Sequence, residues 1–214
     1  MKSFAKYGVD ENLFNIEVPN VKISDQDPEI VHVNYISVFE EDSYLQSRVL
    51  IEIGARSLTE PMEIKPIKSI IDLHYPESEF TEGSFNVQAV SPEKTLLEKM
   101  ILLHEEFQKE SDKIRYHRMS RHLYDIYQIM KTEYGNRAFK DSQLFTNICI
   151  HREKLTPVKN VNYKGLTINT LKFTPPIKFM DLYRTDYKEM QTTMIFGESP
   201  SFEELIADIE EYIG

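Results

Sequence analysis

The stretch Ser91-Pro92-Glu93-Lys94-Thr95-Leu96-Leu97-Glu98-Lys99 marks the point at which the sequence changes its pattern. A serine in the capping position, a proline in the first helical position and an acid in the first turn together predict the start of a helix. Leu96, Met100, Leu103 and Phe107 then recur at helical spacing. A helical part of the chain therefore begins at about residue 91.

The sequence before this point alternates apolar and polar residues, as a half-buried strand does. The expected strands are 14–18, 20–24, 30–38, 48–53 and 85–90. Segment 64–71 fits either a strand or a short helix, because its periodicity does not decide between them.

The sequence after this point predicts a helical region with one irregular section. Further helices are expected at 118–134 (with Gly135 as the stop), 144–154, 179–194 and 202–213, and a short β-rich stretch at 162–173. We therefore predict an α+β protein with a β-rich domain at residues 1–90 and a helical domain at residues 91–214.

Composition excludes several classes of protein. The chain has 214 residues and a net charge of −10, and it contains no apolar run of about 18 residues, so no membrane span is expected. Its seven glycines are too dispersed for a Walker loop or a dinucleotide fingerprint. One cysteine, Cys149, cannot form an internal disulfide, and the start of the chain carries no apolar signal region, so we expect a cytoplasmic protein.

Charge is distributed unevenly along the chain. Residues 137–180 carry eight basic and two acidic residues, although the protein as a whole is acidic. An acidic protein does not bind nucleic acid through bulk charge, but this stretch could form a local basic surface. The alternative is that it is an ordinary solvated face.

Two charged residues in the helical part are candidates for chemistry. Lys99 lies at the border of an apolar stripe, where it either extends toward solvent or holds phosphate oxygens in a cleft. Asp125 follows Arg121 by four residues and His122 by three, so it is either one member of a surface ion pair or a carboxylate held for metal or general-base work.

Other candidate binding residues also have an ordinary structural interpretation. Arginines and histidines cluster at the start of the second helix, where they could grip phosphates or pair with acids of the preceding helix and loop; they are Arg115, His117, Arg118, Arg121 and His122. Asp25-Gln26-Asp27 imitates a two-metal carboxylate pair, but Pro28 makes it a turn composition. Glu52 is an acid within an apolar strand, and it faces solvent if Val49 and Ile51 face the core.

Two motifs carry a resemblance to a known family. Ser91–Lys99, followed by Leu102-Leu103-His104-Glu105-Glu106, resembles the third motif of the AbiEii/AbiGii nucleotidyltransferase toxins, and Arg118–Asp125 resembles their fourth motif. The similarity extends in order through the segments Val49–Pro61, His151-Arg152, Asp186–Met190 and Met194–Gly197.

The resemblance implies part of a DNA polymerase β-like nucleotidyltransferase mixed sheet followed by a helical C-terminal domain. It implies a toxin of a bacterial toxin–antitoxin or phage abortive-infection system that uses Mg²⁺ to transfer nucleotides from a nucleoside triphosphate to RNA, with tRNA as the expected acceptor. Lys99 would contact the triphosphate and Asp125 would act on the attacking hydroxyl. The nucleotide-binding residues would be Arg118, Arg121, His122 and Arg56, and Glu52 would supply a metal ligand.

One departure from the family pattern limits these expectations. The family begins with a glycine-serine motif and then an Asp-x-Asp strand, whereas here Gly83-Ser84 follows Asp25 and Asp27. We therefore expect a truncated or split enzyme that is weak or inactive alone, and an antitoxin protein, a homo-oligomer or an N-terminal partner chain as its partner. The sequence leaves open whether the chain is an enzyme or a non-catalytic RNA- or protein-binding module derived from the family.

Overall fold

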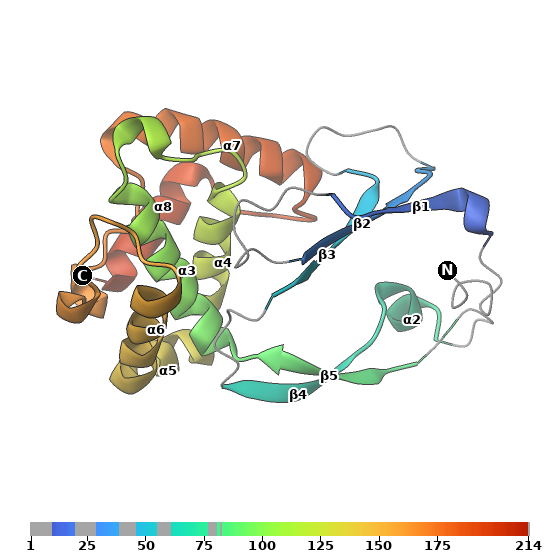
Figure 1. The fold of residues 1–214 in the computed structure, drawn as a ribbon, viewed down its shortest axis with the longest axis horizontal. Helices are drawn as coiled ribbons and strands as arrows, with labels where there is room; N and C mark the ends of the chain where they lie inside the picture. The colour runs from blue at the N-terminus through green and yellow to red at the C-terminus, as the bar shows by residue number, and fades with distance from the viewer. Residues whose placement is uncertain are drawn as a thin grey trace. The chain divides into compact units, whose positions relative to one another are not determined.

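The computed structural model describes residues 10–19, 29–38, 46–54, 61–76, 81 and 83–213. The chain forms two compact units, one made of residues 1–57 and 185–199 and the other of residues 58–184 and 200–214. The described elements are antiparallel strands and α-helices, which confirms the α+β class (Figure 1). A domain boundary at residue 90 stays a prediction.

The first unit contains a three-stranded antiparallel sheet in the order β1-β2-β3. Its strands are β1 (Phe14–Glu17), β2 (Glu29–Tyr35) and β3 (Arg48–Ile53). Three of the expected strands therefore form, whereas the one expected at 20–24 lies outside the described residues.

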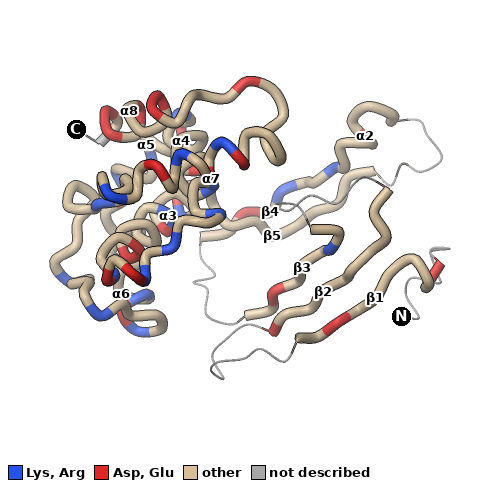
Figure 2. Tube along the Cα trace, turned by 90° about the horizontal axis from the view of Figure 1, so that it is seen from above, with Lys and Arg blue, Asp and Glu red and all other residues tan. Residues whose placement is uncertain are grey.

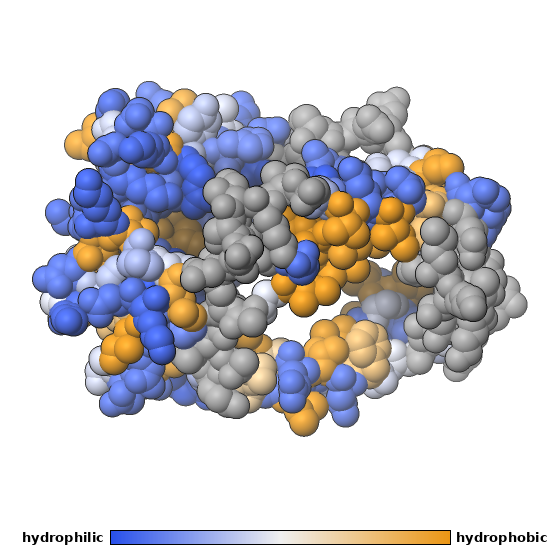
Figure 3. Space-filling view, in the orientation of Figure 1, coloured by the Kyte–Doolittle hydropathy of each residue, from blue (hydrophilic) through white to orange (hydrophobic). Residues whose placement is uncertain are grey.

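The sheet leaves many aliphatic side chains exposed. Val49, Leu50, Ile51 and Ile53 of β3 are each between 42% and 62% exposed. Because successive side chains of a strand point to opposite faces, β3 presents apolar groups on both faces. Figure 3 shows hydrophobic surface gathered over this sheet.

The ambiguous segment 64–71 contains parts of both predicted elements. β4 (Met62–Ile67) pairs antiparallel with β5 (Phe85–Val90), and helix α2 (Ile70–His74) follows β4 after two residues. The Ser69 hydroxyl oxygen accepts a hydrogen bond from the Asp72 N–H at 2.9 Å, which caps the helix and ends the strand.

Helix α3 (Pro92–Phe107) is the central helix of the second unit (Figure 1). It begins as the sequence predicts, because the Ser91 hydroxyl oxygen accepts a hydrogen bond from the Lys94 N–H at 3.3 Å and Pro92 occupies the first turn. Leu96, Leu97, Met100, Ile101 and Leu103 are completely buried. These residues lie on more than one side of the helix, so α3 is surrounded by its neighbours α4, α5 and α6.

The remaining helices are α4 (Ser120–Met130), α5 (Glu133–Lys140), α6 (Ser142–Leu155), α7 (Met180–Thr193) and α8 (Phe202–Ile213). The helices expected at 144–154, 179–194 and 202–213 are thereby confirmed. The charged positions of α8 are all acidic, five Asp and Glu residues, which appear red in Figure 2.

Two sequence predictions in this part of the chain are wrong. The helix expected at 118–134 is two helices, and Gly135 lies inside α5 instead of ending a helix. A Cβ atom on Gly135 would lie 2.5 Å from the backbone carbonyl oxygen of Met130, so glycine permits the tight α4–α5 junction. The stretch 162–173, expected to be β-rich, forms 3₁₀ turns at Tyr163–Gly165 and Ile168–Thr170.

Within the described part of the chain, no helix is both long enough and apolar enough to cross a membrane.

Candidate functional site

The structure brings the two principal candidates of the sequence into contact. Lys99 lies on α3 and Asp125 on α4, and the Lys99 Nζ is 2.7 Å from the Asp125 Oδ2. The side chains are 22% and 44% exposed, respectively. An ion pair this exposed stabilises the fold by about 1 kcal/mol or less. A highly charged anion can therefore replace Asp125 as the partner of Lys99.

His122 completes the cluster. Its Nδ1 lies 3.4 Å from the Lys99 Nζ. Burial, followed by the positive charges of Lys99 and Arg121, lowers the pKa of His122 to about 4. The imidazole is therefore neutral at pH 7, and its Nδ1 can accept a proton or a hydrogen bond.

The start of α4 adds the features of an anion site. Its N-cap residue, Met119, offers no side-chain hydrogen bond, and the first turn contains no acid. Ser120, which could have capped the helix, is buried, and its hydroxyl donates to the Tyr183 carbonyl oxygen at 2.9 Å. A helix N-terminus without an acidic or capping side chain favours anions.

Arg118 precedes this helix start in a costly backbone conformation. Its φ is +57°, the left-handed region that residues with a Cβ atom rarely adopt. Such a conformation costs about 1–2 kcal/mol for a residue other than glycine. Strain of this kind gathers at functional sites, and here it occurs next to the start of α4.

The two neighbouring arginines differ in what they contact. Arg121 is exposed and forms no ion pair within the residues that the structure describes. Arg115, in contrast, is held by Glu106: its Nε and Nη2 lie 3.0 and 2.7 Å from Glu106 Oε2, and its backbone N–H donates to Glu106 Oε1 at 2.8 Å. The structural interpretation, pairing with an acid of the preceding helix, is thus confirmed for Arg115.

Sequence reasoning missed a largely buried network at the end of α3. Glu105, at the end of α3, accepts hydrogen bonds from Arg152 Nε at 2.8 Å and from the Tyr163 hydroxyl at 2.6 Å. Tyr163 also accepts a hydrogen bond from the Val158 N–H at 3.1 Å, so the network ties α3 to α6 and to the following loop. The adjacent acids Glu105 and Glu106 were the available signal, because neighbouring positions on an enclosed helix cannot both face solvent.

The remaining predicted site residues belong to the other unit of the chain or lie outside the described residues. Glu52 is exposed on β3, in the other unit of the chain, where it lies opposite Ile30. Arg56, Asp25 and Asp27 lie outside the described residues.

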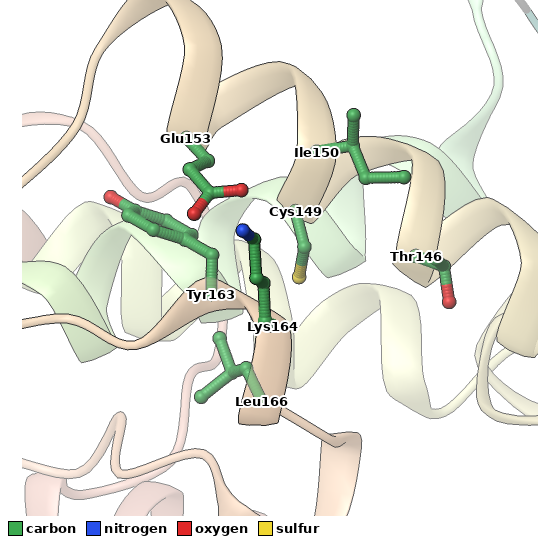
Figure 4. Close-up of a pocket in the computed structure, with 7 residues that line it drawn as sticks. All are labelled: Thr146, Cys149, Ile150, Glu153, Tyr163, Lys164 and Leu166. Carbon is green, nitrogen blue, oxygen red and sulfur yellow. The ribbon is translucent and has the colours of Figure 1, made fainter.

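A separate pocket of about 340 Å³ lies between α6 and the loop that follows it. It is lined by Thr146, Cys149, Ile150, Glu153, Tyr163, Lys164 and Leu166 (Figure 4). None of the predicted site residues lines it. Burial raises the pKa of the Cys149 thiol to about 11, so this cysteine is not a reactive nucleophile.

The cluster therefore combines the cations Lys99 and Arg121, the neutral His122 and the N-terminus of α4. Asp125 is its carboxylate. Such a set suits the binding of phosphate oxygens.

A family model described as "Nucleotidyl transferase AbiEii toxin, Type IV TA system" matches residues 4–208. The chain belongs to the AbiEii family. The resemblance drawn from the two motifs is thereby confirmed, whereas no curated protein and no solved structure matches the chain.

AbiEii membership implies a divalent metal ion, and Mg²⁺ is the ion expected for nucleotidyl transfer. This ion is held by carboxylate oxygens from more than one residue or by carboxylates together with substrate phosphates. No three His, Cys, Asp or Glu side chains come together among the described residues, and Asp125 is engaged by Lys99. The described residues alone do not form a magnesium site.

Proposed function

We propose that this AbiEii protein binds the triphosphate of a nucleoside triphosphate at the Lys99–His122–Asp125 cluster, as part of nucleotidyl transfer to RNA. The single observation that carries the proposal is the 2.7 Å contact between Lys99 and Asp125 beside the uncapped start of α4. This contact joins the two motifs by which the sequence resembles the family.

The ion pair has a direct consequence for the reaction. When phosphate oxygens bind Lys99, the ammonium group exchanges a carboxylate partner for a more highly charged one. Asp125 is then released from its partner and is able to orient an RNA hydroxyl or accept its proton. Binding of the nucleotide thus exposes the carboxylate that the next step needs.

The chemical step is an in-line displacement. The RNA hydroxyl oxygen forms a bond to the α-phosphorus of the nucleotide, the bond from that phosphorus to the leaving oxygen breaks, and pyrophosphate departs. In this proposal, the hydroxyl proton passes to Asp125. Lys99, Arg118 and Arg121 hold the negative charge of the triphosphate, and His122 is placed to accept a proton as that charge arrives.

The test is equilibrium binding of each of the four nucleoside triphosphates to the wild type and three variants. Lys99→Ala removes a charge-assisted hydrogen bond of about 1.5–3 kcal/mol, so we expect affinity to fall about 10- to 100-fold. Lys131→Ala is the matched control, because Lys131 also lies by α4 and forms a half-exposed ion pair, at 2.9 Å to Asp208.

Asp125→Asn separates binding from chemistry. The variant keeps the shape of the side chain but removes the charge that competes for Lys99, so nucleotide affinity should be kept or should rise while transfer is lost. Equal affinity in the wild type and Lys99→Ala would contradict the proposal.

We further propose that transfer by this chain alone is weak and that tRNA is the acceptor. The order of its motifs supports the first point, because Gly83-Ser84 follows Asp25 and Asp27 instead of preceding them. A Mg²⁺ ion would complete the site only with ligands beyond the described residues.

One observation favours a second candidate, an RNA- or protein-binding module. Lys154, Lys159 and Lys164, from the basic stretch 137–180, are all exposed. Charge reversal at these three positions would abolish RNA binding by such a module, whereas Lys99→Ala would leave it unchanged. The opposite pattern is expected for the transferase.

A further inference from the structure

Strand β3 is an edge strand with the composition of a central one. Four of its six residues are aliphatic, and each of these is at least 42% exposed. Its outer side pairs with no other strand in the part of the chain that the structure describes. Edge strands that remain in solvent are usually protected by lysine, proline or a bulge, none of which interrupts β3.

The ladder shows which backbone groups of β3 point outward. Tyr35 N–H donates to the Ser47 carbonyl oxygen at 3.0 Å, and alternate residues of an antiparallel pair bond to the same neighbour. Val49, Ile51 and Ile53 therefore bond toward β2. The backbone groups of Arg48, Leu50 and Glu52 point away from the sheet.

The outward-facing residues are self-complementary. If two copies of β3 pair antiparallel about a twofold axis at Leu50, Leu50 lies opposite itself and Arg48 lies opposite Glu52 of the second copy. On the other face, Val49 lies opposite Ile51 of the second copy. Figure 2 shows β3 with a basic position near its start and an acidic position near its end, the polarity that this pairing requires.

Hydrogen bonding agrees with this register. Each Leu50 N–H donates to the Leu50 carbonyl oxygen of the other copy, and each Glu52 N–H donates to the Arg48 carbonyl oxygen, which gives four bonds. The Arg48 N–H is already bonded to the Gln46 carbonyl oxygen at 2.7 Å. The Arg48 guanidinium lies 3.3 Å from His32 Nδ1, so it is held on the face from which it would meet Glu52.

We propose that β3 is a dimerisation edge, at which a second copy of this chain extends the sheet to six strands through symmetric β3–β3 pairing. The charge complementarity of Arg48 and Glu52 selects a second copy over another protein, because one strand supplies both members of the pair in the one register that uses all three outward-facing residues. The pairing brings the exposed aliphatic side chains of the two copies into cross-strand contact. It does not depend on the proposed nucleotide site.

Reversing the charges at positions 48 and 52 of the 214-residue chain tests the proposal. Sedimentation equilibrium over about 1–100 µM should show a dimer for the wild type. Arg48→Glu and Glu52→Arg each place like charges opposite one another twice, so each should weaken the dimer about tenfold or more. The double variant, with both substitutions, restores opposite charges and should dimerise like the wild type. Glu63→Arg, a charge reversal on the separate strand β4, should leave the dimer unchanged.

A further variant keeps the test independent of the charged pair. Leu50→Lys places two ammonium groups side by side at the twofold axis, and it should give a monomer with the circular dichroism of the wild type. A wild type that is monomeric up to 100 µM would overturn the proposal. So would a folded double variant that stays monomeric, or single variants that dimerise as tightly as the wild type.

Discussion

His122 should make the folding stability of the second unit of the chain decrease in mild acid. The side chain is neutral in the folded protein because burial, Lys99 and Arg121 lower its pKa to about 4. In the unfolded chain its pKa returns to about 6.5. Between these values the unfolded state binds the additional proton, so stability falls as the pH falls.

The size of the effect follows from the two pKa values. At pH 7 the folded histidine is neutral and the unfolded one is about three-quarters neutral, so the proton costs the folded state only about 0.2 kcal/mol. At pH 5 the unfolded histidine is protonated and the folded one is neutral. The loss between pH 7 and pH 5 is therefore about 2 kcal/mol from this side chain alone.

The test replaces His122 with glutamine (His122→Gln), which keeps a polar side chain of similar length but cannot titrate. Urea denaturation of the wild type and the variant, followed by circular dichroism at 222 nm, would be compared at pH 7, 6 and 5. The wild type should lose about 2 kcal/mol more than the variant over this range. His104, whose pKa burial also lowers, is present in both proteins and cancels.

The pKa of His122 in the folded protein can also be measured directly. NMR titration of the His122 ring should give an apparent pKa well below 6. Parallel loss of stability in both proteins, or a ring that titrates near 6.5, would show that burial and neighbouring cations do not keep this histidine neutral.

Three further predictions concern single side chains. Arg118→Gly should be about 1 kcal/mol more stable than Arg118→Ala in urea denaturation, because only glycine adopts a φ of +57° without cost; both should lose nucleotide affinity in equilibrium binding. Ser91→Ala should lower the unfolding free energy by about 1 kcal/mol through loss of the α3 cap, and an unchanged urea midpoint would contradict this. The Cys149 thiol should react with iodoacetamide at pH 7.5 about a hundredfold more slowly than a free cysteine, since its pKa is about 11; fast labelling of the folded protein would show that the thiol is accessible.

Local patterns predicted the parts of the fold that depend on local physics. The Ser91 cap and the proline after it placed the start of α3, and alternation placed β1, β2, β3 and β5. The α4–α5 junction could not be predicted in this way, because Gly135 is required by a backbone contact with Met130. A stop signal and a close-packing signal look the same in the sequence.

The candidate site shows the same division. Motif spacing singled out Lys99 and Asp125, but it offered Arg121 as the partner of Asp125, four residues away on one helix. The structure instead pairs Asp125 with Lys99 from another helix, at 2.7 Å. The Glu105–Arg152–Tyr163 network was missed because its members are up to 58 residues apart and meet only when α3 and α6 pack.

The proposed function requires Lys99 to bind the triphosphate for transfer to RNA. The most direct test is label transfer from each of the four nucleoside triphosphates to total tRNA, with Mg²⁺ present, by the wild type, Lys99→Ala and the control Lys131→Ala. The proposed function predicts transfer that is weak for this chain alone, is lost in Lys99→Ala and is kept in Lys131→Ala. Transfer that is equal in all three proteins would contradict it.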